Sequence, residues 1–181
     1  MIKLITENAV GPDSNNGVLK PHILNNDSIK LLLERLGDEY TAHYFYNSAA
    51  NWCAGVGYQK AAKFFAAESM SELEHAQKLQ KYLVDWNVTP VIPKVETHKD
   101  FATLVDIIEG AYKIEYDLFT KYVANSQALF TSDLATFDFL KEFRDIQTSS
   151  VAEYSDLLNA LELIDVNSRL DVIHFEDYYF A

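Results

Sequence analysis

The sequence is short of cysteine, of positive charge and of long apolar runs. Its single cysteine, Cys53, excludes a disulfide within the chain and fits a small hydrophobic residue inside a helix. Lysine and arginine number 15 against 27 acidic residues, and the net charge of -12 opposes nucleic-acid binding and favours attraction of cations. No apolar run approaches the ~20 residues of a membrane helix, and the opening MIKLITENAV lacks the apolar stretch of a signal peptide. We expect a soluble cytoplasmic protein whose partners include neither nucleic acid nor membrane.

Alternating strand patterns are missing as well. Glycine and proline fall almost entirely between long segments whose apolar residues recur with helical periodicity. A chain of 181 residues with 49% hydrophobic content can bury one sizeable core and leaves little for a second domain. The sequence therefore predicts one all-α domain over residues 26–164, between an irregular N-terminal arm (1–25) and a tail (165–181).

Four long helices are expected in this domain, over roughly residues 26–55, 58–87, 99–129 and 131–163. Asn26, Asp27 or Ser28 can cap the first helix, and the run Thr131-Ser132-Asp133 can cap the fourth. Because the break between the first two helices is so short, they must form an antiparallel hairpin. Prolines stop the second helix, and the extended segment that follows is long enough to cross the bundle. The result is an antiparallel four-helix bundle with one long crossover between the second and third helices.

Two structures remain open for the tail. Ser168 could cap a short fifth helix that carries Leu170, Ile173 and Phe175. Alternatively, the tail lies on the surface without regular structure.

A carboxylate and an imidazole stand three residues apart in the second helix, at Glu72 and His75. On a helix this spacing points both side chains in one direction, toward whatever the helix packs against. A buried Glu and His side by side are costly unless a charged or hydrogen-bonding partner lies between them, and a metal ion answers that need. The pair therefore suggests a metal site inside the bundle.

Each of the other helices also places a polar residue on its apolar stripe. Glu39 and Tyr46 lie two turns apart on the first helix, with His43 between them. Glu115 lies among core residues of the third helix, a stripe that ends at Tyr122, and Gln147 does so on the fourth. A single carboxylate on a helix is usually solvated, so the coincidence across four helices is what favours a site.

Three buried carboxylates would repel one another and raise their pKa values, unless cations neutralise them. Carboxylate oxygens with one nitrogen ligand suit iron or manganese better than a structural zinc ion. Glu72 could bridge two metals, with Glu39 and His75 completing one site and Glu115 the other. Tyr46 and Gln147 would lie beside them.

Over about residues 31–163 the chain resembles ferritins of the non-haem, ferroxidase-bearing kind. The resemblance is carried by the segments LGDEYTAHYFY, the following Trp52-Cys53, ESMSELEHAQKLQKYL, YKIEYDLF, and Gln147 after FDFLKEF. It implies a ferritin-like bundle in which Glu39, Glu72, His75 and Glu115 bind two iron ions per subunit. Tyr46 and Gln147 correspond to neighbouring residues of the ferroxidase centre.

The implied activity is oxidation of Fe(II) to Fe(III) by O2 or H2O2, with storage of the product as mineral. The implied partner is the chain itself, in a shell of twenty-four subunits. Asp133 stands where family members line channels into the shell. Alternatively, Asp133 only caps the start of the fourth helix and faces solvent.

Several positions depart from related families. Bacterioferritins carry a second Glu-x-x-His on the fourth helix, where this chain has Ile146-Gln147-Thr148-Ser149, and Leu73 replaces their haem-binding methionine. We therefore expect no haem. Ile146 and Ser150 replace carboxylates that hold a third iron in bacterial ferritins, which argues against a third site.

Two other functions remain to be weighed. One is a rubrerythrin-like peroxidase, a di-iron oxidoreductase of small oligomeric state that stores no iron, although the chain has no CxxC pair. The other is a metal-free structural bundle, which would leave the buried acids unpaired. Two further polar residues on the inward faces, His43 and Glu68, could form an entry relay or supply extra ligands, although for His43 we favour a satisfied core histidine.

Overall fold

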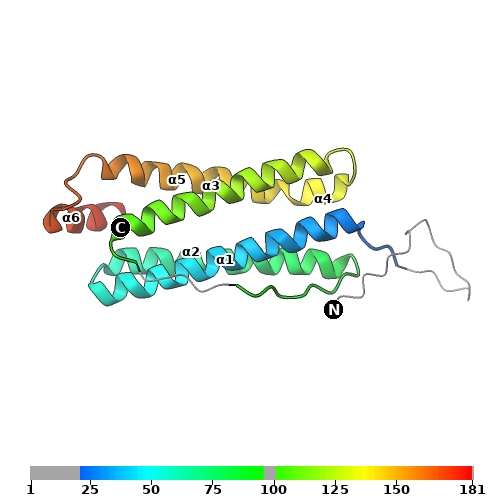
Figure 1. Ribbon diagram of the computed structural model, residues 1–181, viewed down its shortest axis with the longest axis horizontal. Helices are drawn as coiled ribbons and strands as arrows, with labels where there is room; N and C mark the ends of the chain where they lie inside the picture. The colour runs from blue at the N-terminus through cyan, green and yellow to red at the C-terminus, as the bar shows by residue number, and fades with distance from the viewer. Residues whose placement is uncertain (1–20, 96–100, 181) are drawn as a thin grey trace, which may run out of the picture.

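The computed structural model describes residues 21–95 and 101–180, and within these ranges every regular element is an α-helix. The helices are α1 (Asn26–Val56), α2 (Gln59–Asp85), α3 (Leu104–Leu129), α4 (Leu134–Phe139), α5 (Lys141–Leu161) and α6 (Arg169–Tyr179). The long helices lie side by side, α1 paired with α2 and α3 with α5 (Figure 1). The predicted all-α four-helix bundle with a short C-terminal helix is confirmed. Among the described helices, none has the length and apolar character to cross a membrane.

The ends of α1 follow from its sequence. Asn25, one residue before the expected cap, accepts a hydrogen bond from the backbone N–H of Ser28 at 2.8 Å and begins the helix. At the other end Gly57 has a φ of 104°, and its N–H bonds to the carbonyl of Cys53. Only glycine adopts this left-handed conformation without strain, so α1 runs on to Val56 and turns there into α2.

The crossover after α2 leads back along the bundle, so that α2 and α3 run in the same direction (Figure 1). Pro93 lies over α1, because a Cβ added to Gly37 would be 3.7 Å from its Cγ. The expected start of α3 at residue 99 lies outside the described residues, and the helix begins at Leu104. Thr103 and Asp106 form a reciprocal capping box there, which fixes the start of α3 after the predicted position.

The predicted fourth helix is wrong in one respect: it is broken at Leu140 into α4 and α5. Arg144 explains the break, because its guanidinium donates to the carbonyl of Phe137 at 3.2 Å and lies 4.6 Å from the centre of the Phe137 ring. In a regular helix that carbonyl would accept from the N–H of Lys141. A side chain that enters the helical hydrogen-bond ladder in this way bends or breaks the helix.

Asp133 caps α4 with both of its carboxylate oxygens. One accepts from the N–H of Thr136 at 3.1 Å, and the other accepts from the hydroxyls of Thr136 and Ser28, each at 2.7 Å. Burial raises the pKa of Asp133, but the hydrogen bonds from Thr136 and Ser28 outweigh it and hold the pKa below its usual value. The carboxylate is thus fully engaged in tying the start of α4 to the start of α1, which favours the helix-cap interpretation.

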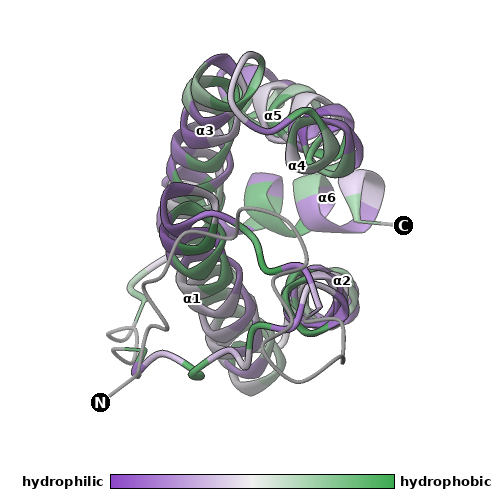
Figure 2. Ribbon diagram, turned by 90° about the vertical axis from the view of Figure 1, so that its right-hand side faces the viewer, coloured by the Kyte–Doolittle hydropathy of each residue, from purple (hydrophilic) through white to green (hydrophobic). Residues whose placement is uncertain are grey.

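The tail forms α6, capped by Ser168 as the helical alternative expected. Of the three apolar residues named for this helix, Phe175 is buried and Leu170 and Ile173 are exposed, and Val172 and Glu176 complete the buried face. The reason lies at the start of α2, where Glu176 accepts hydrogen bonds from the backbone N–H groups of Lys60 and Ala61. A helix start leaves such donors unsatisfied, and turning Glu176 inward satisfies two of them. In Figure 2, a view along the bundle, α6 appears between α2 below and α5 above.

Candidate metal centre

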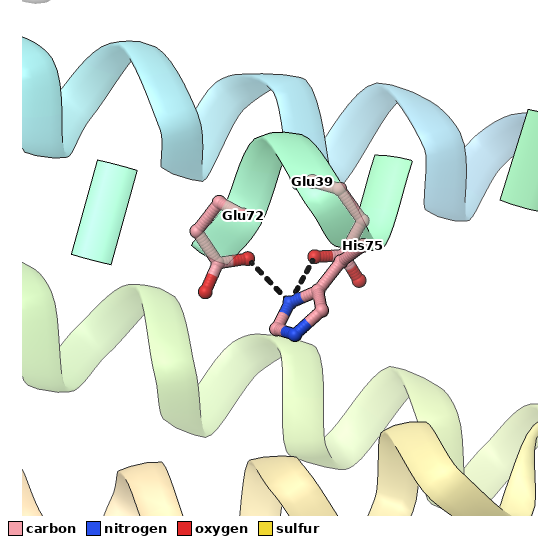
Figure 3. Close-up of side chains that lie close together, drawn as sticks. All are labelled: Glu39, Glu72 and His75. Carbon is pink, nitrogen blue, oxygen red and sulfur yellow. Dashed lines mark hydrogen bonds and ion pairs between the residues drawn. The ribbon is translucent and has the colours of Figure 1, made fainter. Parts of the chain in front are cut away.

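Glu39 of α1 meets Glu72 and His75 of α2 in the middle of the bundle, on the side of these two helices that faces α3 (Figure 3). Their side chains are buried, Glu39 completely. Nδ1 of His75 lies 3.2 Å from Oε2 of Glu72 and 3.6 Å from Oε2 of Glu39. One ligand atom from each residue lies within 4.8 Å of the others, a spacing that suits a single bound cation.

The two carboxylate oxygens of Glu39 differ in their hydrogen bonding. Oε1 accepts a short hydrogen bond from the hydroxyl of Tyr122, whereas Oε2 is buried and accepts none from the described part of the chain. A buried carboxylate oxygen without a donor is costly, and a cation would remove that cost. The donor set therefore fits a hard or borderline divalent metal such as iron.

Glu115, the fourth predicted ligand, lies outside this group of three. It is fully buried on α3 and accepts a short hydrogen bond from the hydroxyl of Tyr46. The side-chain amide of Gln147, oriented to donate, lies 2.9 Å from the other carboxylate oxygen of Glu115 and 3.1 Å from the backbone carbonyl of Glu115. The two predicted neighbours, Tyr46 and Gln147, thus contact Glu115 directly. Their functional roles, and those of the four ligands, remain predictions.

Tyr122 was not predicted from the sequence as a residue of the centre, because it lies on an apolar stripe like any other core residue. A signal was present, because Glu115 and Tyr122 are seven residues apart, as are Glu39 and Tyr46. Seven residues are two helical turns, so each pair lies on one face of its helix. The repeated spacing could have indicated a second tyrosine at the centre.

The charges of the cluster are interdependent. Burial raises the pKa of Glu72 well above its usual value and that of Glu115 to about 7. Burial lowers the pKa of His75, but the two neighbouring carboxylates outweigh it and raise the value to about 10. Burial also raises the pKa of Glu39, yet its contacts with His75 and Glu72 lower it below the usual value. Without metal, the proton on His75 therefore supplies a positive charge beside the ionised carboxylate of Glu39, while burial favours the neutral form of Glu72.

An open pocket between α2 and α5 reaches Glu72 and His75 from the outside. Besides Glu72, its acidic lining residues are Glu68, Asp145 and Glu153. Burial, assisted by the charge of Glu153, raises the pKa of Glu68 to about 7. The pocket is also lined by Ile146 and Ser150, the two residues that stand where a third iron site would require carboxylates. A cation can approach the centre along this acidic surface.

His43 does not face the centre. Its Nδ1 lies 2.7 Å from the backbone carbonyl of Ser69 and 2.9 Å from the Ser69 hydroxyl, which itself donates to the carbonyl of His43. These contacts join α1 to α2. They fit a satisfied core histidine.

Comparison with known proteins agrees with this architecture. The family model of the ferritin-like domain matches residues 29–164. A bacterial non-heme ferritin of Campylobacter jejuni is 28% identical over 145 residues, which cover 78% of this chain and 86% of that protein. A probable bacterial non-heme ferritin-like protein of Haemophilus influenzae is 25% identical over 149 residues, and a bacterial non-heme ferritin of Staphylococcus aureus is 26% identical over the same length. Both matches cover 81% of this chain and 90% of the relative.

Proposed function

The chain belongs to the ferritin family, and on that premise we propose that it oxidises Fe(II) at a di-iron centre around Glu72 and stores the ferric product. The observation that carries the proposal is the buried group of Glu39, Glu72 and His75, with a carboxylate oxygen that accepts no hydrogen bond from the described residues. Iron is here a substrate and a cargo, not a permanent cofactor. The resemblance to bacterial non-heme ferritins supports the same assignment.

Binding begins with the exchange of a proton for a metal ion. Fe(II) approaches through the pocket between α2 and α5, where the acidic side chains raise the local cation concentration. It takes the place of the proton on Nδ1 of His75, since a metal ligand must be deprotonated. Oε2 of Glu39 and the carboxylate of Glu72 complete the first site.

The second Fe(II) binds between Glu72 and Glu115, so that Glu72 serves both ions. Tyr46 and Gln147 each donate to Glu115 and hold its carboxylate in place. Two Fe(II) ions supply two electrons, which with two protons reduce O2 to H2O2, or H2O2 to water. Anionic ligands stabilise Fe(III) more than Fe(II) and so favour the oxidation, and the surrounding core limits the escape of reactive products.

We further propose that the ferric product is stored inside a shell of twenty-four copies of the chain. Family membership supports this assembly. Residue 73 is a leucine, whereas a bacterioferritin would have a haem-binding methionine there, and this difference supports a shell without haem. The location of the protein in the cell stays a prediction.

The proposed function is tested by adding Fe(II) in air and following ferric absorbance. The native protein should oxidise iron rapidly and Glu72→Ala slowly, whereas Glu74→Ala, an exposed neighbour on the same helix, should match the native protein. Equal rates in the native protein and Glu72→Ala would contradict the proposed centre. Particle mass then separates the storage shell from a peroxidase of small oligomeric state, because only the shell approaches half a megadalton.

A further inference from the structure

Two tyrosines form hydrogen bonds between α1 and α3, each to a glutamate of the other helix. Tyr46 of α1 donates to Oε1 of Glu115 on α3, and Tyr122 of α3 donates to Oε1 of Glu39 on α1. Each tyrosine follows the glutamate of its own helix by seven residues. The two contacts are therefore reciprocal, although the sequence similarity to ferritins drew attention to Tyr46 alone.

The two glutamates that receive these hydroxyls are nevertheless in different environments. Glu115 has a second donor, because the amide of Gln147 lies 2.9 Å from its other oxygen. Among the residues in the described ranges, none donates a hydrogen bond to Oε2 of Glu39, which instead lies 3.6 Å from Nδ1 of His75. The Tyr122 hydroxyl thus occupies one oxygen of Glu39 and leaves the other for the metal.

We propose that Tyr122 is the positioning residue of Glu39: by holding Oε1, it directs Oε2 toward Nδ1 of His75 and sets the geometry of the iron site that these residues share. Tyr46 has the corresponding effect on Glu115 and the other site. The inference rests on the proposed function, because it assigns a residue to the same centre. Partners that orient metal ligands typically affect metal affinity by about 10- to 100-fold.

Tyr122 also has a packing role, which must be separated from the role of its hydroxyl. The side chain is fully buried, and its ring stacks on Phe143 with a centroid distance of 5.3 Å. Tyr122→Phe keeps the ring and removes the hydroxyl alone. Tyr154→Phe is the matched control, since Tyr154 is equally buried in the same core and its hydroxyl has no hydrogen-bond partner in the described part of the chain.

The test is a Co(II) titration of iron-free protein, followed by visible absorption and by proton NMR. Only one of the two proposed sites contains a histidine, so hyperfine-shifted ring protons of His75 mark the filling of that site. We expect Tyr122→Phe to weaken Co(II) binding at the His75 site by about 10- to 100-fold and to leave the other site nearly unchanged. Tyr46→Phe should weaken the other site, and Tyr154→Phe neither.

Native affinity at the His75 site in Tyr122→Phe would overturn the inference. Equal weakening of both sites, together with a lower melting temperature, would also overturn it, because that result indicates a purely structural role. If the native protein binds no Co(II) at His75, the proposed function fails as well. If the native protein and Tyr46→Phe respond as expected but Tyr122→Phe does not, only the role of Tyr122 is wrong.

Discussion

Oε2 of Glu39 lies 3.6 Å from Nδ1 of His75, yet it accepts no hydrogen bond from the described part of the chain. The oxygen belongs to a completely buried carboxylate whose pKa is lowered, so it carries negative charge in the core. In the metal-free protein the protonated imidazole of His75 balances that charge at a distance. A metal ion between the two residues would bind both directly, and this relationship underlies the following predictions.

The stability of the iron-free protein should fall as the pH rises from about 5 to about 10. The pKa of Glu115 is raised to about 7, so the folded state holds a proton that the unfolded state releases near its ordinary value of 4.5. The pKa of His75 is raised to about 10 from 6.5, and its stabilising contribution, complete below 6.5, is lost as the pH approaches 10. Both shifts act in the same direction.

Thermal unfolding of the iron-free protein across this pH range measures the effect. In Glu115→Gln, which cannot ionise at this position, the fall in melting temperature between about pH 5 and about pH 7 should be shallower than in the native protein. Glu74→Gln on the exposed face of α2 should keep the native slope. Identical slopes in all three proteins would show that Glu115 does not hold the extra proton.

Divalent metal should reverse this trend, because cations compete with the protons on Glu115 and His75. At a free metal concentration of 100 times Kd, binding to the folded state adds about 2.7 kcal/mol to the free energy of unfolding. The gain should grow with pH and should vanish after chelation. Differential scanning fluorimetry with Co(II) measures it, with Glu72→Ala as the variant that should gain little.

Glu176 should stabilise the protein through the start of α2. Its carboxylate accepts from the N–H groups of Lys60 and Ala61 at 2.6 and 3.0 Å, and Glu176→Ala removes both contacts. We expect a loss of about 1–2 kcal/mol in the free energy of unfolding, as for other helix caps. Asp177→Ala is the control, because its ion pair with Lys60 is exposed and should matter little. Urea unfolding that ranks Asp177→Ala as the more damaging change would refute the assignment.

Two glycines should respond to alanine in opposite ways. A Cβ at Gly110 would lie 2.9 Å from the ring of Phe45, so Gly110→Ala must displace the ring and should cost about 1–3 kcal/mol in unfolding free energy. A Cβ at Gly55 would meet no atom within 4 Å from the rest of the described chain beyond its own turn of helix, and Gly55→Ala should stabilise α1 by up to about 1 kcal/mol. Chemical denaturation of the two variants compares them directly. A stabilising Gly110→Ala would mean that α1 and α3 do not approach closely at this point.

The arrangement of the long helices could be predicted from the sequence, because helical periodicity and short turns are local properties of the chain. Glu39, Glu72 and His75 could be identified for a related reason, since a polar residue on an apolar stripe is visible without knowing its partners. Their position on one side of the centre, with Glu115 held separately by Tyr46 and Gln147, depends on contacts between helices. Such contacts have no local signature.

The features that sequence reasoning missed have the same origin. The break at Leu140 depends on Arg144 reaching the carbonyl of Phe137, and the inward face of α6 depends on Glu176 reaching the start of α2. Tyr122 was the exception, because its spacing from Glu115 repeats that of Tyr46 from Glu39. A tyrosine on an apolar stripe resembles any other core residue until its hydroxyl has a partner.

The most direct test of the proposed di-iron centre is anomalous diffraction at the iron edge, from crystals soaked anaerobically with Fe(II). We expect one peak bounded by Glu39, Glu72 and His75, and a second between Glu72 and Glu115. Crystals of Glu72→Ala treated in the same way should lose both peaks. Iron bound only elsewhere in the native protein, with no peak beside Glu72, would contradict the account.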